Sequence, residues 1–186
     1  GAPLIESYGM TEAAQLICAN PVPADGPRYA GSVGICAGPD GRVFDAETGR
    51  PAAFEEDGST TGEMCIAGPS VMLGYARNPE ANAGSFIKDD EGRAWFRTGD
   101  LVARTPEGYY SIVGRIKEII NRAGEKIAPA KLDKILAYEN RKDSVVSFGV
   151  PDPDYGQGVA AAMVFDPDKF EDDRAPTDAE TRRRAE

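Results

Sequence analysis

The sequence contains no histidine among its 186 residues. This absence excludes catalytic triads that depend on an imidazole base, and it excludes metal sites built on His ligands. Any chemistry must therefore use carboxylates, hydroxyls, Lys, Arg and backbone groups.

Cysteine is scarce as well, with Cys18, Cys36 and Cys65 far apart in the sequence. An odd number of cysteines without a CxxC pair fits neither a secreted disulfide framework nor a zinc site. We expect reduced thiols in an intracellular protein, cytoplasmic or peroxisomal.

Long apolar runs and excess positive charge are both missing. No stretch approaches the ~20 apolar residues of a membrane helix, and we expect no signal peptide. Lys and Arg number 21 against 31 Asp and Glu, a net charge of −10, which argues against a nucleic-acid partner. An acidic chain can still bind a nucleotide, because Mg²⁺ supplies positive charge locally.

Both ends of the sequence look cut. The chain begins at Gly1 without an initiator Met, and it ends in "APTDAETRRRAE", which is typical of the start of a polar helix. We expect a chain truncated at both ends, with N- and C-terminal segments of its parent missing.

Two regions differ in their pattern. Up to Gly114, frequent Gly, Pro and Asp turns separate short candidate strands, which suggests an antiparallel barrel or sheet. The expected strands are 32–36, 42–45, 63–67, 95–104 and 109–113. The stretch "DGSTTGEM" at 57–64 resembles a phosphate loop, but we interpret it as a turn leading into a strand that starts at 62–63.

After Gly114 the pattern favours a small α+β unit. Residues 116–120 fit either a short helix or a hairpin. Pro129 suits the first turn of a helix, whose apolar stripe would be Leu132, Ile135 and Leu136. Residues 144–150 alternate, with Val146, Phe148 and Val150 on one face, and 159–165 read as a strand covered on both sides. The predicted class is α+β, with domains 1–114 and 115–186 and a further helix near the C-terminus.

Three motifs carry the chemistry: "YGMTE" at 8–12, "WFRTGDLV" at 95–102 and "VGRIKEIINRAGEKIAP" at 113–129. Alone, the first motif could be a strand end turning into a helix, with Thr11 as N-cap. Together, and in this order, the motifs resemble the AMP-forming acyl-CoA synthetases of the adenylate-forming superfamily. The resemblance covers nearly the whole chain and is closest to oxalate–CoA ligases.

The resemblance implies a fold and a reaction. Residues 1–114 would be the end of the large AMP-binding domain with its β-barrel subdomain, and 115–186 an incomplete, mobile C-terminal domain. In this family a carboxylic acid attacks ATP to give acyl-AMP and pyrophosphate, and the thiol of coenzyme A then gives acyl-CoA, with Mg²⁺ as cofactor. No protein nucleophile is needed, so positioning and charge stabilisation suffice.

The resemblance also implies roles for the nucleotide site. Asp100 would accept from both ribose hydroxyls, Arg115 would contact the ribose, and Tyr8 would lie on the adenine face. Thr11 would donate to the α-phosphate, and Glu12 would hold Mg²⁺. The simpler alternatives are an Asp that satisfies its own turn and a core tyrosine.

Further roles concern the acyl group and coenzyme A. Gly9 and Met10 would border the acyl pocket. Lys117 would be the hinge, and the turn Gly124-Glu125-Lys126 would form the thioester loop. The alternatives are an ordinary exposed Lys and a hairpin turn.

The family's phosphate loop ending in Pro-Lys, and its lysine in a "PKTxxGK" context, are not found in the sequence. We therefore expect the chain alone to be inactive as an adenylating enzyme. The alternative is a truncated, non-catalytic nucleotide-binding or regulatory module of the same family.

Overall fold

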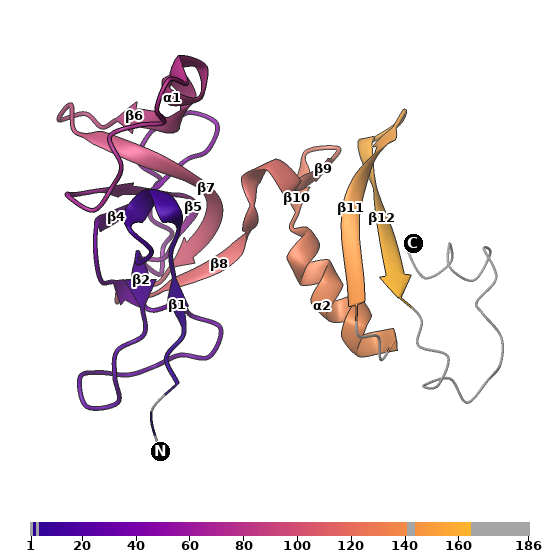
Figure 1. Cartoon of the computed structure of the whole chain (residues 1–186). Helices are drawn as coiled ribbons and strands as arrows, with labels where there is room; N and C mark the ends of the chain where they lie inside the picture. Colours follow the sequence, from indigo (N-terminus) through magenta and orange to yellow (C-terminus); the bar gives the residue numbers. More distant parts are fainter. Residues whose placement is uncertain (1, 3, 141–143, 165–186) are drawn as a thin grey trace. The chain divides into compact units, whose positions relative to one another are not determined.

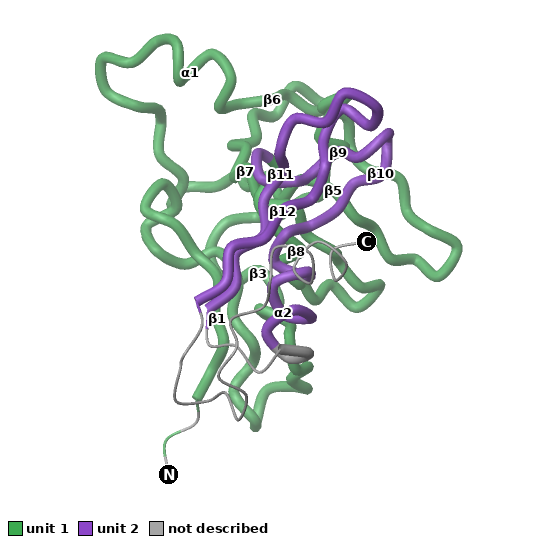
Figure 2. The backbone as a smooth tube through the Cα atoms, turned by 90° about the vertical axis from the view of Figure 1, so that its right-hand side faces the viewer, with its two compact units in different colours: residues 1–116 green, residues 117–186 purple. Residues whose placement is uncertain are grey.

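The computed structural model describes residues 2, 4–140 and 144–164. The chain divides into two compact units, Gly1–Ile116 and Lys117–Glu186 (Figure 2). The structure is α+β with mostly strands and few helices, as predicted. Among the described residues, no helix combines the length and the apolar composition that crossing a bilayer requires.

The first unit is built around one antiparallel sheet centred on its longest strand (Figure 1). Its strands are β4 (Asp40–Phe44), β5 (Thr60–Ala67), β6 (Phe86–Lys88), β7 (Ala94–Arg104) and β8 (Tyr110–Arg115). Their order is β4-β5-β7-β6, and β8 also pairs with β7. The expected barrel is therefore wrong: in the described part of the chain the sheet stays open, because β6 and β8 share β7 and no pairing joins them to β4.

The sheet is buried on both faces along β5. Successive β5 side chains point to opposite faces. Met64 and Ile66 join one core cluster, whereas Cys65 and Ala67 join another with Trp95. Both faces are therefore packed, which explains why the predicted strand 63–67 reads as apolar without alternation. The strand begins earlier than predicted, at Thr60, directly after the turn of "DGSTTGEM".

A small three-stranded sheet carries the first motif. It consists of β1 (Ser7–Tyr8), β2 (Cys18–Ala19) and β3 (Ile35–Cys36), in that order. The strand predicted at 32–36 is shorter, because the Ser32 hydroxyl and the Val33 N–H both bond the Tyr110 carbonyl instead of a β2 partner. A 3₁₀ turn, η1 (Thr11–Ala13), lies between β1 and β2. The helix α1 (Pro79–Ser85), further along the chain, was not predicted.

The second unit contains a hairpin, a helix and a second hairpin. Its elements are β9 (Ile120–Arg122), β10 (Glu125–Ile127), α2 (Pro129–Asn140), β11 (Ser144–Asp152) and β12 (Gly156–Val164), with sheet order β10-β9-β12-β11. The helix begins at Pro129 as predicted. Both readings of 116–120 hold in part, since the 3₁₀ turn η2 (Ile116–Glu118) precedes the hairpin.

The second hairpin is less covered than its sequence suggested. The helix α2 lies against β11, where the Asp133 carboxylate accepts from the Ser147 N–H at 2.6 Å (Figure 1). Ser147 is therefore buried, while Val146 and Phe148 on the opposite face are 60% and 44% exposed. No described residue of β12 is buried, so the double coverage expected for 159–165 is wrong. The expected C-terminal helix lies outside the described residues.

Candidate functional site

A wide bulge in β7 displays Asp100. Glu63 of β5 pairs with Leu101, and Cys65 pairs with Arg97, so Met64 alone faces the three residues 98–100. Gly99 in this bulge has a φ of 75°, in the left-handed region that glycine tolerates best. Bulges of this kind re-aim a side chain out of the regular alternation. Here the bulge sets the direction of the Asp100 carboxylate.

The bulge is held from inside by Glu63, which is only 2% exposed. Its Oε2 accepts from Nε and Nη2 of Arg97 at 2.8 and 2.6 Å, and its Oε1 accepts from the Gly99 N–H at 3.1 Å. The Thr98 hydroxyl donates to the Met64 carbonyl at 2.8 Å and accepts from the Asp100 N–H at 3.1 Å. Sequence reasoning missed this network; the signal for it was a Glu inside an otherwise apolar strand.

Asp100 joins three strands through its two oxygens. Its Oδ1 lies 2.9 Å from Nε of Arg115 on β8, and its Oδ2 accepts from the Tyr8 hydroxyl of β1 at 2.5 Å. The Asp100 side chain is 5% exposed, whereas Arg115 is 56% exposed. Burial, followed by the bond to Asp100, raises the pKa of Tyr8 well above its usual range, so its hydroxyl keeps its proton and donates. Tyr8, Asp100 and Arg115 are thus brought together.

Glu12 lies in the turn η1, close in sequence to Tyr8. Its Oε1 accepts from the Tyr75 hydroxyl at 2.9 Å. The Asn82 amide of α1 fixes Tyr75 in turn, bonding its N–H and its carbonyl at 2.7 and 2.9 Å. Burial, followed by the bond to Glu12, raises the pKa of Tyr75. This chain of contacts orients the Glu12 carboxylate.

Thr11 does not cap a helix. Met10 occupies the cap position, without a side-chain capping bond, and Thr11 is an exposed member of the 3₁₀ turn. The alternative in which Thr11 is an N-cap is therefore wrong, and Thr11 is exposed to solvent. Among the residues that the structure describes, no three His, Cys, Asp or Glu side chains gather as a metal site, and the metal contact of Glu12 stays a prediction.

Gly9 is required by the path of its own loop. A Cβ at Gly9 would lie 1.4 Å from the Gln15 carbonyl oxygen, a distance that no side chain tolerates. The next residue, Met10, is half-buried and packs against the core of the first unit. The loop therefore crosses itself closely at the second residue of "YGMTE", and the predicted acyl contact of Gly9 and Met10 stays a prediction.

The remaining predicted residues belong to the second unit. Lys117 lies in η2, whose first residue closes the first unit. Ala123 and Gly124 form the two-residue loop between β9 and β10, with φ of 51° and 93°, as in a type I′ hairpin. The Gly124 N–H donates to the Asn121 side chain at 2.9 Å, and Glu125 and Lys126 continue into β10. The hairpin alternative describes the local geometry; a role in catalysis stays a prediction.

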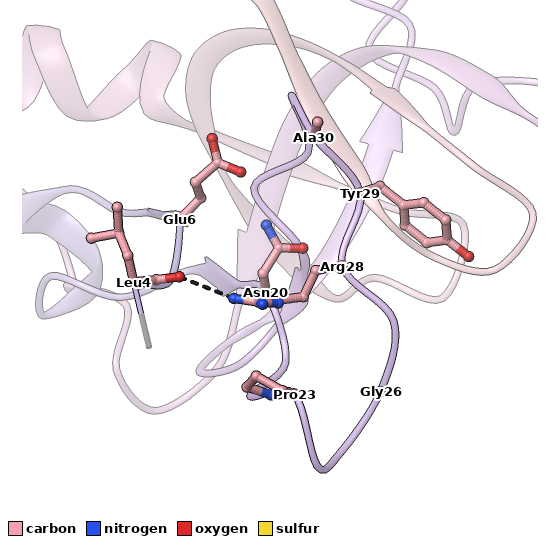
Figure 3. Close-up of a pocket in the computed structure, with 8 residues that line it drawn as sticks. All are labelled: Leu4, Glu6, Asn20, Pro23, Gly26, Arg28, Tyr29 and Ala30. Carbon is pink, nitrogen blue, oxygen red and sulfur yellow. Dashed lines mark hydrogen bonds between the residues drawn. The ribbon is translucent and has the colours of Figure 1, made fainter. Parts of the chain in front are cut away.

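A hollow of about 490 Å³ in the first unit lies apart from these residues (Figure 3). Glu6, Asn20 and Tyr29 contribute to its lining, and the Arg28 guanidinium donates to the Leu4 carbonyl at 3.1 Å across one side. None of the predicted site residues lines it. The candidate nucleotide site is therefore the group of Tyr8, Asp100 and Arg115 and not this hollow.

Comparisons with known proteins give matches in family model, sequence and fold. The profile of the family described as AMP-binding enzyme matches residues 1–76. The chain is 42% identical over 165 residues to the probable CoA ligase CCL9 of Humulus lupulus, covering 88% of this chain and 29% of the relative. It is 42% identical over 164 residues to the oxalate–CoA ligase of Arabidopsis thaliana, covering 88% and 30%.

A solved structure shows the same fold. The ATP-bound MatB of Rhodopseudomonas palustris superposes with a TM-score of 0.76 at 34% identity, covering 91% of this chain and 32% of that one. The chain thus spans about 30% of the length of the curated relatives it matches. By these matches and the shared fold, the chain is similar to AMP-binding enzymes and to CoA ligases.

Proposed function

We propose that this chain is the nucleotide-holding part of an ATP-dependent carboxylate–CoA ligase. The observation that carries the proposal is the meeting of Tyr8, Asp100 and Arg115 from three different strands. A buried carboxylate that two donors hold in a fixed direction, beside an exposed guanidinium, suits a ligand rich in hydroxyl and phosphate oxygens. The match of residues 1–76 to the AMP-binding enzyme family and the ATP-bound structural relative support the same reading.

Asp100 is proposed to bind the ribose of ATP. Each of its oxygens has two lone-pair directions, and the structure uses one on each, for Arg115 and for Tyr8. One direction on each oxygen then serves the two vicinal ribose hydroxyls. Tyr8 would present its ring to the adenine while its hydroxyl stays bonded to Asp100, and Arg115 would add donors towards ribose oxygens.

Glu12 and Thr11 are proposed to act on the phosphates. Glu12 offers a hard oxygen ligand, and the Tyr75 bond to Oε1 directs Oε2 as the ligand atom for Mg²⁺. When bound, Mg²⁺ would neutralise phosphate charge during attack of the carboxylic acid. The exposed Thr11 hydroxyl would donate to the α-phosphate, and Gly9 and Met10 would border the acyl group.

Lys117 is proposed as the hinge between two half-reactions. The division of the chain between Ile116 and Lys117 supports this position. Gly124, Glu125 and Lys126 would then come to the active site for attack by the thiol of coenzyme A. Lys117→Pro should slow thioester formation at least about tenfold more than adenylation, because it restricts one backbone torsion at the hinge. Equal loss of both half-reactions would count against the hinge.

Two further parts of the proposal concern the identity of the carboxylic acid substrate and the activity of this chain by itself. Two relatives are named oxalate–CoA ligases, so oxalate is the first candidate among carboxylic acids. Because the chain spans about 30% of such relatives and lacks a phosphate loop motif, we propose that it does not form acyl-AMP alone.

The test uses a longer protein that contains this sequence, assayed by ATP–pyrophosphate exchange with a panel of carboxylic acids including oxalate. Asp100→Ala removes two charge-assisted acceptors, so exchange should fall by roughly a hundredfold. Asp57→Ala, at an exposed turn, is the matched control and should leave exchange unchanged. Unchanged exchange in the Asp100 variant would overturn the assignment. Binding of ATP without exchange for any acid would favour the non-catalytic module.

A further inference from the structure

The cysteine pair Cys18 and Cys36 has the geometry of a disulfide that has not formed. The two residues are register partners on the antiparallel strands β2 and β3, and their sulfur atoms lie 3.8 Å apart. All three cysteines of the chain are free thiols in the structure. The distance between the sulfurs is within reach of a small rotation of either side chain.

The backbone at this pair also suits a cross-strand bond. The Ala37 N–H donates to the Ile17 carbonyl at 2.9 Å, which makes the neighbouring pair a hydrogen-bonded one. Hydrogen-bonded and non-hydrogen-bonded pairs alternate along antiparallel strands, so Cys18 and Cys36 occupy the closer, non-hydrogen-bonded position. There the Cα atoms are about 4.5 Å apart, inside the roughly 4.4–6.8 Å range that disulfides span.

The two thiols differ in accessibility and acidity. Cys18 is fully buried at 0% exposure, whereas Cys36 is half-buried. The hydrogen bond between the two thiols lowers the pKa of Cys36 and, together with burial, raises the pKa of Cys18. Cys36 is therefore the more available thiolate, and the thiolate is the nucleophile in disulfide exchange. Strands of only two residues open locally at low cost, and such opening makes the buried Cys18 thiol accessible for the second exchange step.

We propose that Cys18 and Cys36 form a reversible intramolecular disulfide with a low-molecular-weight disulfide, such as glutathione disulfide, as the oxidant. The Cys36 thiolate attacks one glutathione sulfur, the glutathione S–S bond breaks, and one glutathione thiolate leaves. Cys18 then loses its proton to solvent and attacks the Cys36 sulfur of the mixed disulfide, which releases the second glutathione. The protein loses two electrons and two protons, and glutathione disulfide gains them to give two glutathione molecules.

The third cysteine provides an internal reference. Cys65 is 0% exposed within β5, and burial raises the pKa of its thiol well above the usual range. It packs in the core cluster with Phe44 and Trp95, whereas Cys18 packs in the other cluster of the first unit. A reaction confined to Cys18 and Cys36 should therefore leave Cys65 as a thiol.

The experiment equilibrates the 186-residue chain with graded ratios of reduced and oxidised glutathione, alkylates it under denaturing conditions, and measures intact mass and linked peptides. We expect two of three thiols per chain to be protected at oxidising ratios, a peptide linking Cys18 to Cys36, and full reversal by dithiothreitol. Cys65→Ser should behave like the wild type with one alkylation fewer, and Cys18→Ser should stop at the glutathione adduct on Cys36.

Two results would overturn the proposal. One is three free thiols in the wild-type chain at every glutathione ratio. The other is a linkage that involves Cys65, or one whose yield rises with protein concentration and therefore joins two chains. Three free thiols in the wild-type chain at every ratio overturn the proposal by themselves, so a variant that fails to fold leaves the test intact.

Discussion

Replacement of Glu63 by Ala should destabilise the first unit more than any surface change. The Glu63 carboxylate, 2% exposed, accepts two hydrogen bonds from Arg97 and one from the Gly99 N–H. Alanine removes all three acceptor contacts and leaves the guanidinium and the amide facing an empty space. The bulge that carries Asp100 loses its internal support at the same time.

The size of the effect follows from the burial of Glu63 and the partial exposure of Arg97. Removal of one partner from a buried ion pair costs about 3–5 kcal/mol. Arg97 keeps a 31% exposed side chain, so water restores part of its solvation. We therefore expect a loss of about 2–3 kcal/mol in the free energy of unfolding, or roughly 5–10 °C in Tm for a chain of this size.

Urea unfolding followed by fluorescence is the assay, because Trp95 is the single tryptophan and lies on the same strand as Arg97. A double-mutant cycle with Arg97→Ala isolates the pair, and we expect a coupling of about 1.5–3 kcal/mol. Asp40→Ala breaks the exposed pair with Arg93, 68% and 44% exposed, and should cost under about 1 kcal/mol. A Glu63 variant within about 0.5 kcal/mol of the wild type, or an additive cycle, would refute the reasoning.

Two further predictions concern pH and backbone space. The Trp95 indole N–H, with backbone donors, lowers the pKa of Asp89 in the folded chain. The ionised Asp89 therefore stabilises the fold at pH values above its unfolded pKa of about 3.9. This stabilisation is lost as the pH falls through the folded pKa. Asp89→Asn should flatten this acid-side loss, measured by Trp95 fluorescence, and an unchanged slope would contradict it. Gly9→Ala should cost about 3 kcal/mol or more, because its Cβ would meet the Gln15 carbonyl, whereas Gly84→Ala, with open space in α1, should be neutral or stabilising. Equal urea midpoints for the two variants would count against the close crossing at Gly9.

Local pattern predicted the elements that depend on local physics. The strand expected at 95–104 is Ala94–Arg104, and the helix expected at Pro129 begins there. A long apolar-rich run with β-forming residues, and a proline in a first turn, are signals that neighbouring residues alone supply. Element ends moved where distant groups compete for the backbone, as when Tyr110 takes the bonds of Ser32 and Val33.

Features that depend on pairing between distant segments were not predictable. The open sheet results from β6 and β8 sharing one long strand, which no local pattern encodes. The exposed side chains of Val146 and Phe148 show the same limit: alternation predicts that they share a face, but which face α2 covers depends on tertiary packing. The Glu63 network likewise requires the bulge register to be known.

The candidate site falls between these two cases. Tyr8 and Asp100 are separated by 92 positions; the family resemblance assigned both to one nucleotide, but neither it nor any periodicity predicted their hydrogen bond. The structure brings both together with Arg115, although their roles towards ATP stay proposals. The look-alike loop at 57–64 shows the converse, because its hydroxyls serve a turn: the Ser59 N–H bonds Asp57, and the Thr60 hydroxyl donates to the Ala53 carbonyl.

The direction of the Asp100 carboxylate depends on two independent supports. Glu63 fixes the Gly99 backbone next to Asp100, and Tyr8 and Arg115 each fix one oxygen of the Asp100 carboxylate. A ligand that binds Asp100 needs the free lone pairs of both oxygens to point outward together, so loss of either support should weaken binding even where the carboxylate remains. Glu63 therefore acts on the proposed nucleotide site as a positioning residue. Its mutation should raise the KM for ATP in a longer active protein more than it lowers kcat, whereas simple destabilisation would reduce the amount of folded enzyme and leave KM unchanged.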